Sequence, residues 1–132
     1  MFEKPLVVVN LAIQRRGETF HLLNNWIHSE NKWIRRLAVA TIPPYIRARK
    51  TDSEFCLRLL EKAMLEIDRD VPKAVGWALR EVSKKDPDSV FHFLMKWTGV
   101  EKKEVKWIIR EGMKKLPLRY QEKLRVALGG GR

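Results

Sequence analysis

The chain has 132 residues with 27 Lys and Arg against 16 Asp and Glu, which gives a formal net charge of +11 and an isoelectric point near 10.1. No stretch approaches the roughly 18 consecutive apolar residues of a membrane span, the apolar run at 6–9 is too short for a signal peptide, and a single cysteine excludes a disulfide framework. We therefore expect one cytoplasmic domain over residues 1–132, with 129–132 as a flexible tail.

The hydrophobic periodicity predicts an all-α fold. Apolar residues recur at helical spacing and strand alternation is nowhere sustained, so we expect about seven or eight helices. In chain order they fall near residues 5–14, 18–28, 32–48, 53–66, 71–84, 87–97, 102–115 and 117–128. Pro43 and Pro44 predict a kink or break inside the third helix. Asp86 before a proline, and Thr98 with Glu101, match patterns of helix N-termini.

The predicted helices pair into an internal repeat of roughly 35 to 40 residues. One helix of each pair carries an apolar stripe, at 20–23, 55–60 and 91–94. The next helix begins with a charged residue that is followed by an aromatic or branched residue, at 32–36, 70–73 and 104–107. This pattern predicts a solenoid of stacked helical pairs, in which one layer of helices lines a concave surface.

The positive charge lies mainly at the two ends of the chain. Residues 1–50 have a net charge of +6, residues 51–100 of −1, and residues 101–132 of +6. A polyanion is therefore the first partner to consider, because a solubility role would spread the charge more evenly. The alternative, solvated helix faces without a partner, stays open.

Three segments resemble a known family: Trp26, the run 31–38 that contains Trp33 and two arginines, and above all residues 71–81. Residues 86–94 continue the pattern. They are similar to the AlkD-like DNA alkylation repair family of 3-methyladenine and 7-methylguanine DNA glycosylases. The similarity covers nearly all of this chain and roughly the C-terminal half of a typical member. It implies HEAT-like repeats that hold the backbone of duplex DNA, including alkylated DNA, in a basic concave groove.

The resemblance also implies that one catalytic residue of the family is missing from this chain. In that family an essential Asp, preceded by a Trp one helical turn earlier, lies upstream of the matched arginine helix, which places it at or before Met1. Glu3 and Glu18 are the acids nearest the start, and neither follows a matching aromatic residue. We therefore assign no catalytic residue and expect no glycosylase activity from this polypeptide alone. A truncated glycosylase, a catalytically silent DNA-binding paralogue and an adaptor for an acidic protein are the alternatives.

The strongest site prediction concerns residues 77–84. Trp77 and Arg80 match the family's cleft tryptophan and a DNA-contacting arginine, and Lys84 lies one turn further on the same face. An indole packs on sugar and base, and a guanidinium pairs with phosphate. The alternative is that Trp77 packs between repeats and Arg80 binds a neighbouring carboxylate.

Two further groups complete the predicted DNA-binding set. Arg36 matches a second family arginine, and because Arg35 points about 100° away on a helix, only one of the two should face the groove. We expect Arg36 to be the one that faces the groove, and the alternative role of Arg36 is a salt bridge to the next repeat. Lys106 and Arg110, continued by Lys114, recur every four residues and predict a basic stripe, for which a solvated outer face is the alternative.

The remaining chemistry-bearing residues are predicted to be structural. Core packing is expected for most of the four tryptophans that lie on apolar stripes: Trp26, Trp33, Trp97 and Trp107. Cys56 is expected to be a buried small hydrophobe, and Gly76 to permit close approach of two helices. The histidines have no metal-binding spacing and no cofactor motif occurs, so we predict neither a metal site nor a cofactor.

The opening helix at 5–14 is unusually apolar for the first helix of a solenoid. Part of its surface would be exposed on a monomer, which predicts a homodimer joined through the N-terminal helices. The alternative is that this helix folds back on the second helix and covers its own apolar surface.

Overall fold

The computed structural model describes residues 10, 13–49, 52–66 and 68–129. These residues form eight α-helices and no strand, which confirms the predicted all-α class. The helices are α2 (Arg16–Ile27), α3 (Lys32–Ala40), α4 (Ile42–Ala48), α5 (Ser53–Ala63), α6 (Asp70–Ser83), α7 (Pro87–Trp97), α8 (Lys103–Gly112) and α9 (Leu118–Ala127). Within this part of the chain, no helix is long and apolar enough to cross a membrane.

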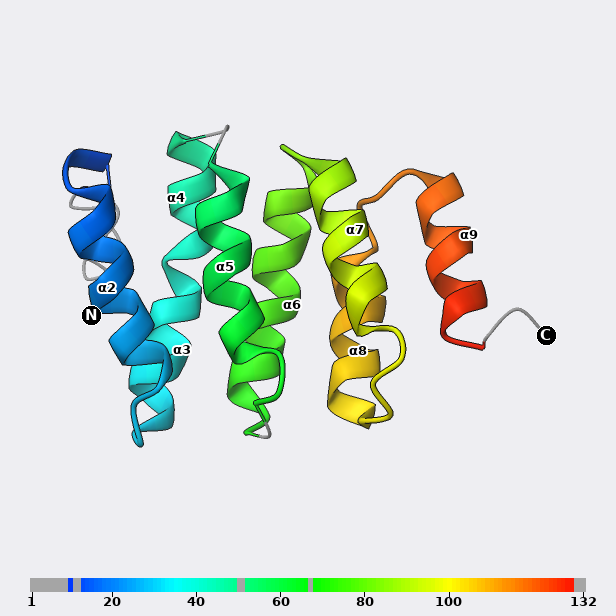
Figure 1. The fold of residues 1–132 in the computed structure, drawn as a ribbon, viewed down its shortest axis with the longest axis horizontal. Coiled ribbons are helices and arrows are strands. Elements are labelled where there is room, and N and C mark those ends of the chain that lie inside the picture. The colour runs from blue at the N-terminus through cyan, green and yellow to red at the C-terminus, as the bar shows by residue number, and fades with distance from the viewer. Residues whose placement is uncertain (1–9, 11–12, 50–51, 67, 130–132) are drawn as a thin grey trace.

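The helices form two layers, as expected for a solenoid of helical pairs (Figure 1). Helices α2, α5, α7 and α9 make a front layer, and α3 with α4, α6 and α8 make a back layer. Contacts run along the back layer from α3 to α6 and from α6 to α8, and across the layers from α2 to α3, α5 to α6 and α7 to α8. Helices α2 to α8 thus bury their apolar stripes on neighbours in both layers.

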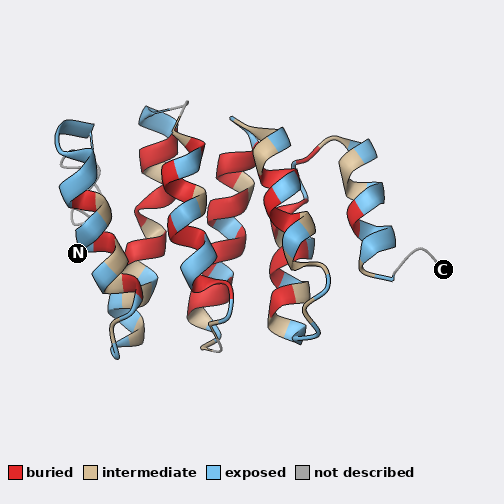
Figure 2. Ribbon diagram, in the orientation of Figure 1, coloured by how far each residue is buried: buried red, intermediate tan, exposed pale blue. Residues whose placement is uncertain are grey.

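One core of buried side chains extends from Leu23 in α2 to Leu124 in α9. Helix α9 is mostly exposed (Figure 2), and Leu124 is its one buried residue. Cys56 is fully buried, and Trp26 and Trp97 pack against the core, as predicted.

The prediction for the other two tryptophans is wrong. The side chains of Trp33 and Trp107 are 57% and 38% exposed, because Ala38 and Val39 in α3, and Val105, Ile108 and Ile109 in α8, already form the buried faces of those helices.

The predicted third helix breaks at Thr41, two residues before the prolines. Pro43 and Pro44 lie in the first turn of α4, where a proline removes no needed hydrogen-bond donor. The Thr41 hydroxyl donates to the Ala38 carbonyl at 2.7 Å, and the Thr41 carbonyl accepts from the Tyr45 amide at 3.1 Å. The chain therefore passes from α3 to α4 without an extended linker.

One of the two predicted helix starts is confirmed. The carboxylate of Asp86 accepts from the Ser89 amide at 3.2 Å and caps α7, with Pro87 in the first turn. The Thr98 and Glu101 pattern is not a capping box: the Thr98 hydroxyl donates back to the Met95 carbonyl at 2.8 Å, and α8 starts later, after Lys102, without a side-chain cap.

Two glycines permit close approach of α6 and α8. A Cβ atom built at Gly76 would lie 3.1 Å from the Glu111 Cβ, as the sequence predicted, and one built at Gly112 would lie 3.0 Å from the Leu79 Cβ. Both contacts are closer than ordinary van der Waals separation. These two helices make the most extensive contact in the described structure.

We expect Gly112→Ala to lower the free energy of unfolding by about 1–2 kcal/mol, because the added methyl group meets the inflexible base of the buried Leu79 side chain. Urea denaturation measures this loss. Gly99→Ala is the matched control, since a Cβ there would meet nothing within 4 Å. Equal stability of the two variants would contradict the close packing of α6 on α8.

Most of the predicted opening helix, and with it the proposed dimer surface, lies outside the described residues, as does the tail at 130–132. Asn10, Ile13 and Gln14 are the described part of that helix, and all three are exposed.

Candidate nucleic-acid interface

The exposed side of the back layer carries three tryptophans. Trp33 in α3, Trp77 in α6 and Trp107 in α8 are 57%, 39% and 38% exposed. Large apolar side chains usually lie inside a protein, so three indoles on one layer of adjacent helices need an explanation.

An arginine follows each of these tryptophans one helical turn later: Arg36, Arg80 and Arg110. Residues three apart on a helix lie on the same face, so each back-layer helix presents an indole and a guanidinium together. We call this surface the Trp–Arg face and define it by these six residues with four nearby cations, Arg47, Lys73, Lys84 and Lys114.

Two carboxylates connect neighbouring helices of this face. Glu81 in α6 accepts from Lys84 Nζ at 2.7 Å and from Arg47 Nε of α4 at 3.1 Å. Burial opposes ionisation of Glu81, but the hydrogen bonds from Lys84 and Arg47 outweigh it and hold the pKa below its usual range. Glu111 in α8 likewise lies 2.8 Å from Lys114 Nζ and 3.9 Å from Arg80 Nη1 of α6.

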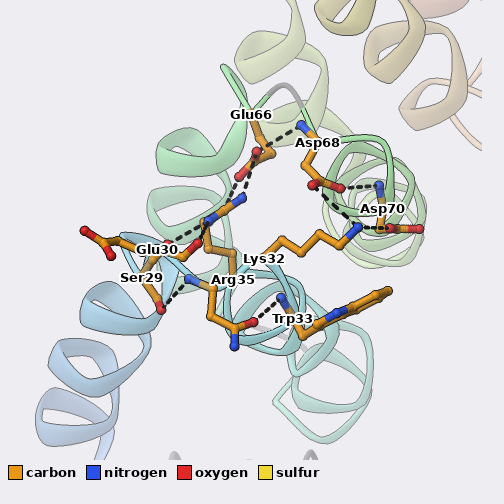
Figure 3. A network of polar contacts seen from close by, with 9 residues as sticks. Ser29, Glu30, Lys32, Trp33, Arg35, Glu66, Asp68 and Asp70 are labelled. Atoms are coloured by element: carbon orange, nitrogen blue, oxygen red, sulfur yellow. Dashed lines mark hydrogen bonds and ion pairs between the residues drawn. The ribbon is translucent and has the colours of Figure 1, made fainter.

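Arg35 and Arg36 have different surroundings, as their 100° separation on a helix requires. Arg35 is largely buried, forms an ion pair with Glu66, and donates to the carbonyls of Ser29 at 2.7 Å and Glu30 at 3.0 Å (Figure 3). The salt bridge considered for Arg36 is therefore made by Arg35. The Arg36 side chain is exposed and has no ion pair within the described part of the chain.

The residues predicted around α6 lie together on the Trp–Arg face. Trp77 is not buried between repeats, which was the alternative role for it. Arg80 Nη1 lies 3.9 Å from Glu111 Oε1, so the carboxylate contact considered as the alternative role of Arg80 is present as a long ion pair. Lys84 is exposed and bound to Glu81.

The predicted stripe on α8 is divided. Lys106 is half-buried and its ammonium lies 3.1 Å from Glu101, in the connection between α7 and α8. Arg110 is exposed, and no described carboxylate lies within ion-pair distance of it. Lys114 is exposed beside Glu111. Arg110 is thus the member of the stripe most available to an anion.

A polar network fixes the start of α3 beside Trp33 (Figure 3). The Asn31 side chain caps the helix by accepting from the Trp33 amide at 2.8 Å. Lys32 Nζ lies 3.3 Å from Asp70 and 3.7 Å from Asp68, and 4.7 Å from the centroid of the Trp33 ring. The network ties α3 to the start of α6 and holds the backbone that carries the exposed indole.

Comparison with known proteins identifies the family. The model of the DNA alkylation repair enzyme family matches residues 7–116, which is well over half of the chain. The chain belongs to the DNA alkylation repair family. This confirms the resemblance noted in residues 26–97. The matched region contains α2 to α8 and with them the entire Trp–Arg face, whereas α9 follows it.

A solved relative shares the fold of this DNA alkylation repair protein. The structure of Pseudomonas fluorescens alkylpurine DNA glycosylase AlkC, bound to DNA containing an abasic site analog, superposes with a TM-score of 0.80 at 20% sequence identity. The match covers 95% of this chain and 36% of AlkC, so the chain spans about a third of the length of that protein. No curated protein matched the sequence.

The sequence did not predict two residues of the face, Trp33 and Trp107, for which core packing was expected. A detectable pattern was present: each is followed by an arginine three residues later, as Trp77 is. Among the described residues, no group of three or more His, Cys, Asp or Glu side chains could hold a metal ion.

Proposed function

We propose that this DNA alkylation repair protein binds duplex DNA through the phosphate backbone, in a groove formed by the Trp–Arg face. The observation that carries the proposal is the exposed Trp and Arg pair on each of three adjacent helices, α3, α6 and α8. A guanidinium binds phosphate oxygens in a bidentate manner, and an indole packs on the apolar parts of sugar and base.

The charge of the face supports an anionic ligand. Seven cations lie on it (Arg36, Arg47, Lys73, Arg80, Lys84, Arg110 and Lys114), and the described carboxylates that form ion pairs with them are Glu81 and Glu111. Asp68 and Asp70 line a hollow with Lys73, but both pair with Lys32. Glu81 and Glu111 are both already paired with cations. Arg36, Lys73 and Arg110 have no ion-pair partner among the described residues, so a ligand can bind them without breaking an existing contact.

The arrangement favours the backbone over the bases. Sequence is read by side chains that reach base edges, usually from a helix that enters the major groove. Here the cations lie on helices that pack against one another along one layer. Contacts to phosphate and sugar position a protein on DNA without specifying sequence.

Titration of fluorescent duplexes by anisotropy tests the proposal. With four to six phosphate contacts, we expect the affinity to fall about 100- to 1,000-fold between 50 and 200 mM salt. Two duplexes of unrelated sequence should bind within a few-fold of each other. Affinity that does not change with salt would contradict backbone binding.

The same titration separates DNA from an acidic protein partner. A polyglutamate chain of equal charge supplies carboxylates but no sugar or base for the three indoles. We expect it to compete at least ten times more weakly than duplex DNA, since it offers the three indoles no apolar sugar surface to pack on. Equal competition would favour the adaptor role. The proposal is confined to binding, because the chain spans about a third of AlkC and the name glycosylase is that protein's.

A further inference from the structure

The front layer contains a hollow between α5 and α7. These two helices contact each other less extensively than α2 contacts α5 or α7 contacts α9. Polar contacts join them near each end, where the Ser53 hydroxyl donates to the Asp86 carboxylate and Lys96 Nζ lies 3.3 Å from Glu61 Oε2. Between these contacts the side chains leave a hollow of about 620 Å³, with α6 behind it (Figure 1). We call it the α5–α7 hollow, and its lining includes Glu54, Leu57, Arg58, His92 and Phe93.

The α5–α7 hollow has an apolar floor and polar walls. Phe93 is 4% exposed and Leu57 is half-buried against the core, so these two side chains form the floor. Glu54 and Arg58 on α5, and His92 on α7, are exposed and form the walls. The hollow is therefore open to solvent on one side and reaches down to the core on the other.

Two opposite charges on the α5 wall are available to a ligand. A glutamate and an arginine four positions apart on a helix usually attract each other. Here the Arg58 guanidinium lies instead over the ring of Phe20 in α2, 4.5 Å from the ring centroid. Neither Glu54 nor Arg58 has an ion-pair partner within the described part of the chain. About one turn further along the two helices, by contrast, Glu61 and Lys96 neutralise each other.

The chemistry of the hollow selects the class of ligand. Its lining pairs the carboxylates of Glu54 and Glu61 with the fixed cations Arg58 and Lys96, so this lining offers a polyanion no net attraction. A small molecule is usually enclosed over most of its surface, which the exposed walls do not allow. A helix that lies along the interval between two other helices buries one side and leaves the other in solvent, and the open hollow fits such a ligand.

We propose that the α5–α7 hollow binds an amphipathic helix of a partner protein. A large apolar side chain of that helix packs on Leu57 and Phe93. A basic residue of the helix pairs with Glu54, and an acidic residue one turn away pairs with Arg58. The wall from Glu54 to Glu61 is about 10 Å long at 1.5 Å per residue, so it holds about two turns of the partner helix. The hollow shares no residue with the Trp–Arg face, so this inference does not rest on the proposed function.

Selection from a displayed library of amphipathic helices tests the proposal. Sixteen-residue helices with randomised side chains on one face are selected on the wild-type protein without DNA. Enriched helices should share a large apolar residue beside a basic and an acidic residue that lie four positions apart. A fluorescent synthetic peptide of the enriched sequence should bind at least tenfold more tightly, by anisotropy, than the same peptide with its two charged residues exchanged. Enrichment of no helix, or of helices without this charge pattern, would contradict the proposal.

Reversal of the two charges on the protein locates the binding site. In Glu54→Arg with Arg58→Glu the preference should invert, so that the exchanged peptide binds at least tenfold more tightly than the original. Lys62→Glu is the matched control and should change either affinity less than threefold, because Lys62 is exposed on α5 but outside the hollow. An unchanged preference in the reversed variant would overturn the proposal. Loss of both peptides by a reversed variant that keeps its helical circular dichroism would overturn it as well.

Light scattering separates a partner helix from a second copy of this chain. We expect the wild-type protein and the reversed variant to have the same mass at micromolar concentration. A wild-type dimer that becomes a monomer in Glu54→Arg with Arg58→Glu would assign the hollow to a second copy and overturn the proposal. Because the peptide measurements contain no DNA, failure of the protein to bind duplex DNA would contradict the proposed function and not this inference.

Discussion

Replacing Arg36, Arg80 and Arg110 together by glutamine is expected to lower the affinity for duplex DNA about 100-fold at 100 mM salt and to reduce the log–log salt slope by about 3. Each guanidinium belongs to a different back-layer helix, so the three changes remove one phosphate contact from each part of the Trp–Arg face. The contacts are far enough apart that their losses should nearly add. Anisotropy titration at several salt concentrations measures both quantities.

The same variant should fold normally. Arg36 and Arg110 have no ion pair with the described residues, and Arg80 has only the 3.9 Å contact with Glu111. We expect the free energy of unfolding to change by less than about 0.5 kcal/mol per substitution. Glutamine at Lys62, Arg119 and Lys123 of the front layer is the matched control and should cost less than threefold in affinity. Equal losses in the two triple variants would show that net charge, and not the Trp–Arg face, determines binding.

Asp52→Ala is expected to lower the free energy of unfolding by about 3 kcal/mol at pH 7. The substitution removes the acceptor of two donors, the buried Tyr45 hydroxyl and the charged Arg16 guanidinium. The Asp52 carboxylate, 12% exposed, accepts from Arg16 Nε and Nη2 at 2.8 Å each and from the Tyr45 hydroxyl. Tyr45 is 2% exposed, so its hydroxyl would be left without a partner in the core. The substitution removes the polar contacts that join α2 and α4 to the start of α5.

The loss should depend on pH in a defined direction. Burial opposes ionisation of Asp52, but the hydrogen bonds from Arg16 and Tyr45 outweigh it, so the pKa of the carboxyl lies below its usual range. A pKa lower in the folded than in the unfolded state stabilises the fold above the unfolded value, about 3.9. This contribution is lost as the pH falls through the folded pKa.

Urea denaturation of wild type and Asp52→Ala at pH 7, 5 and 3 measures the effect. The difference in unfolding free energy should be full at pH 7 and 5 and smaller at pH 3. Glu54→Ala, in the first turn of the same helix and exposed, should cost no more than about 0.5–1 kcal/mol at any of these values. A difference that grows as the pH falls would contradict the assigned pairing.

Local chemistry determined which parts of the fold were predictable. Helix α7 has its predicted bounds, Pro87–Trp97, because an acidic cap followed by a proline specifies a helix start from adjacent residues alone. The Thr98 pattern failed although its spacing was right, since the hydroxyl binds the end of α7 instead of the start of α8. Competition between two neighbouring helices for one side chain cannot be seen in the spacing.

Burial of the tryptophans depended on residues far away in the chain. Trp33 and Trp107 lie at the margin of their apolar stripes, and whether a marginal position is covered depends on what the next layer places above it. The exposure of Arg36 likewise depends on a distant residue. Glu66, thirty-one positions from Arg35, forms the ion pair with Arg35 and leaves Arg36 exposed. The DNA-binding role of the predicted residues stays a prediction, whereas the gathering of all of them except Lys106 on one face is a property of the fold.

The missing side chains of Gly76 and Gly112 determine how closely α6 and α8 approach. The interval between these helices is also the interval between Arg80 and Arg110, and therefore between the two positions at which a strand of phosphates would be held. A single methyl group at either glycine would widen that interval without altering any cation. In the proposed interface, the spacing of the phosphate-binding positions would thus depend on two residues that have no side chain.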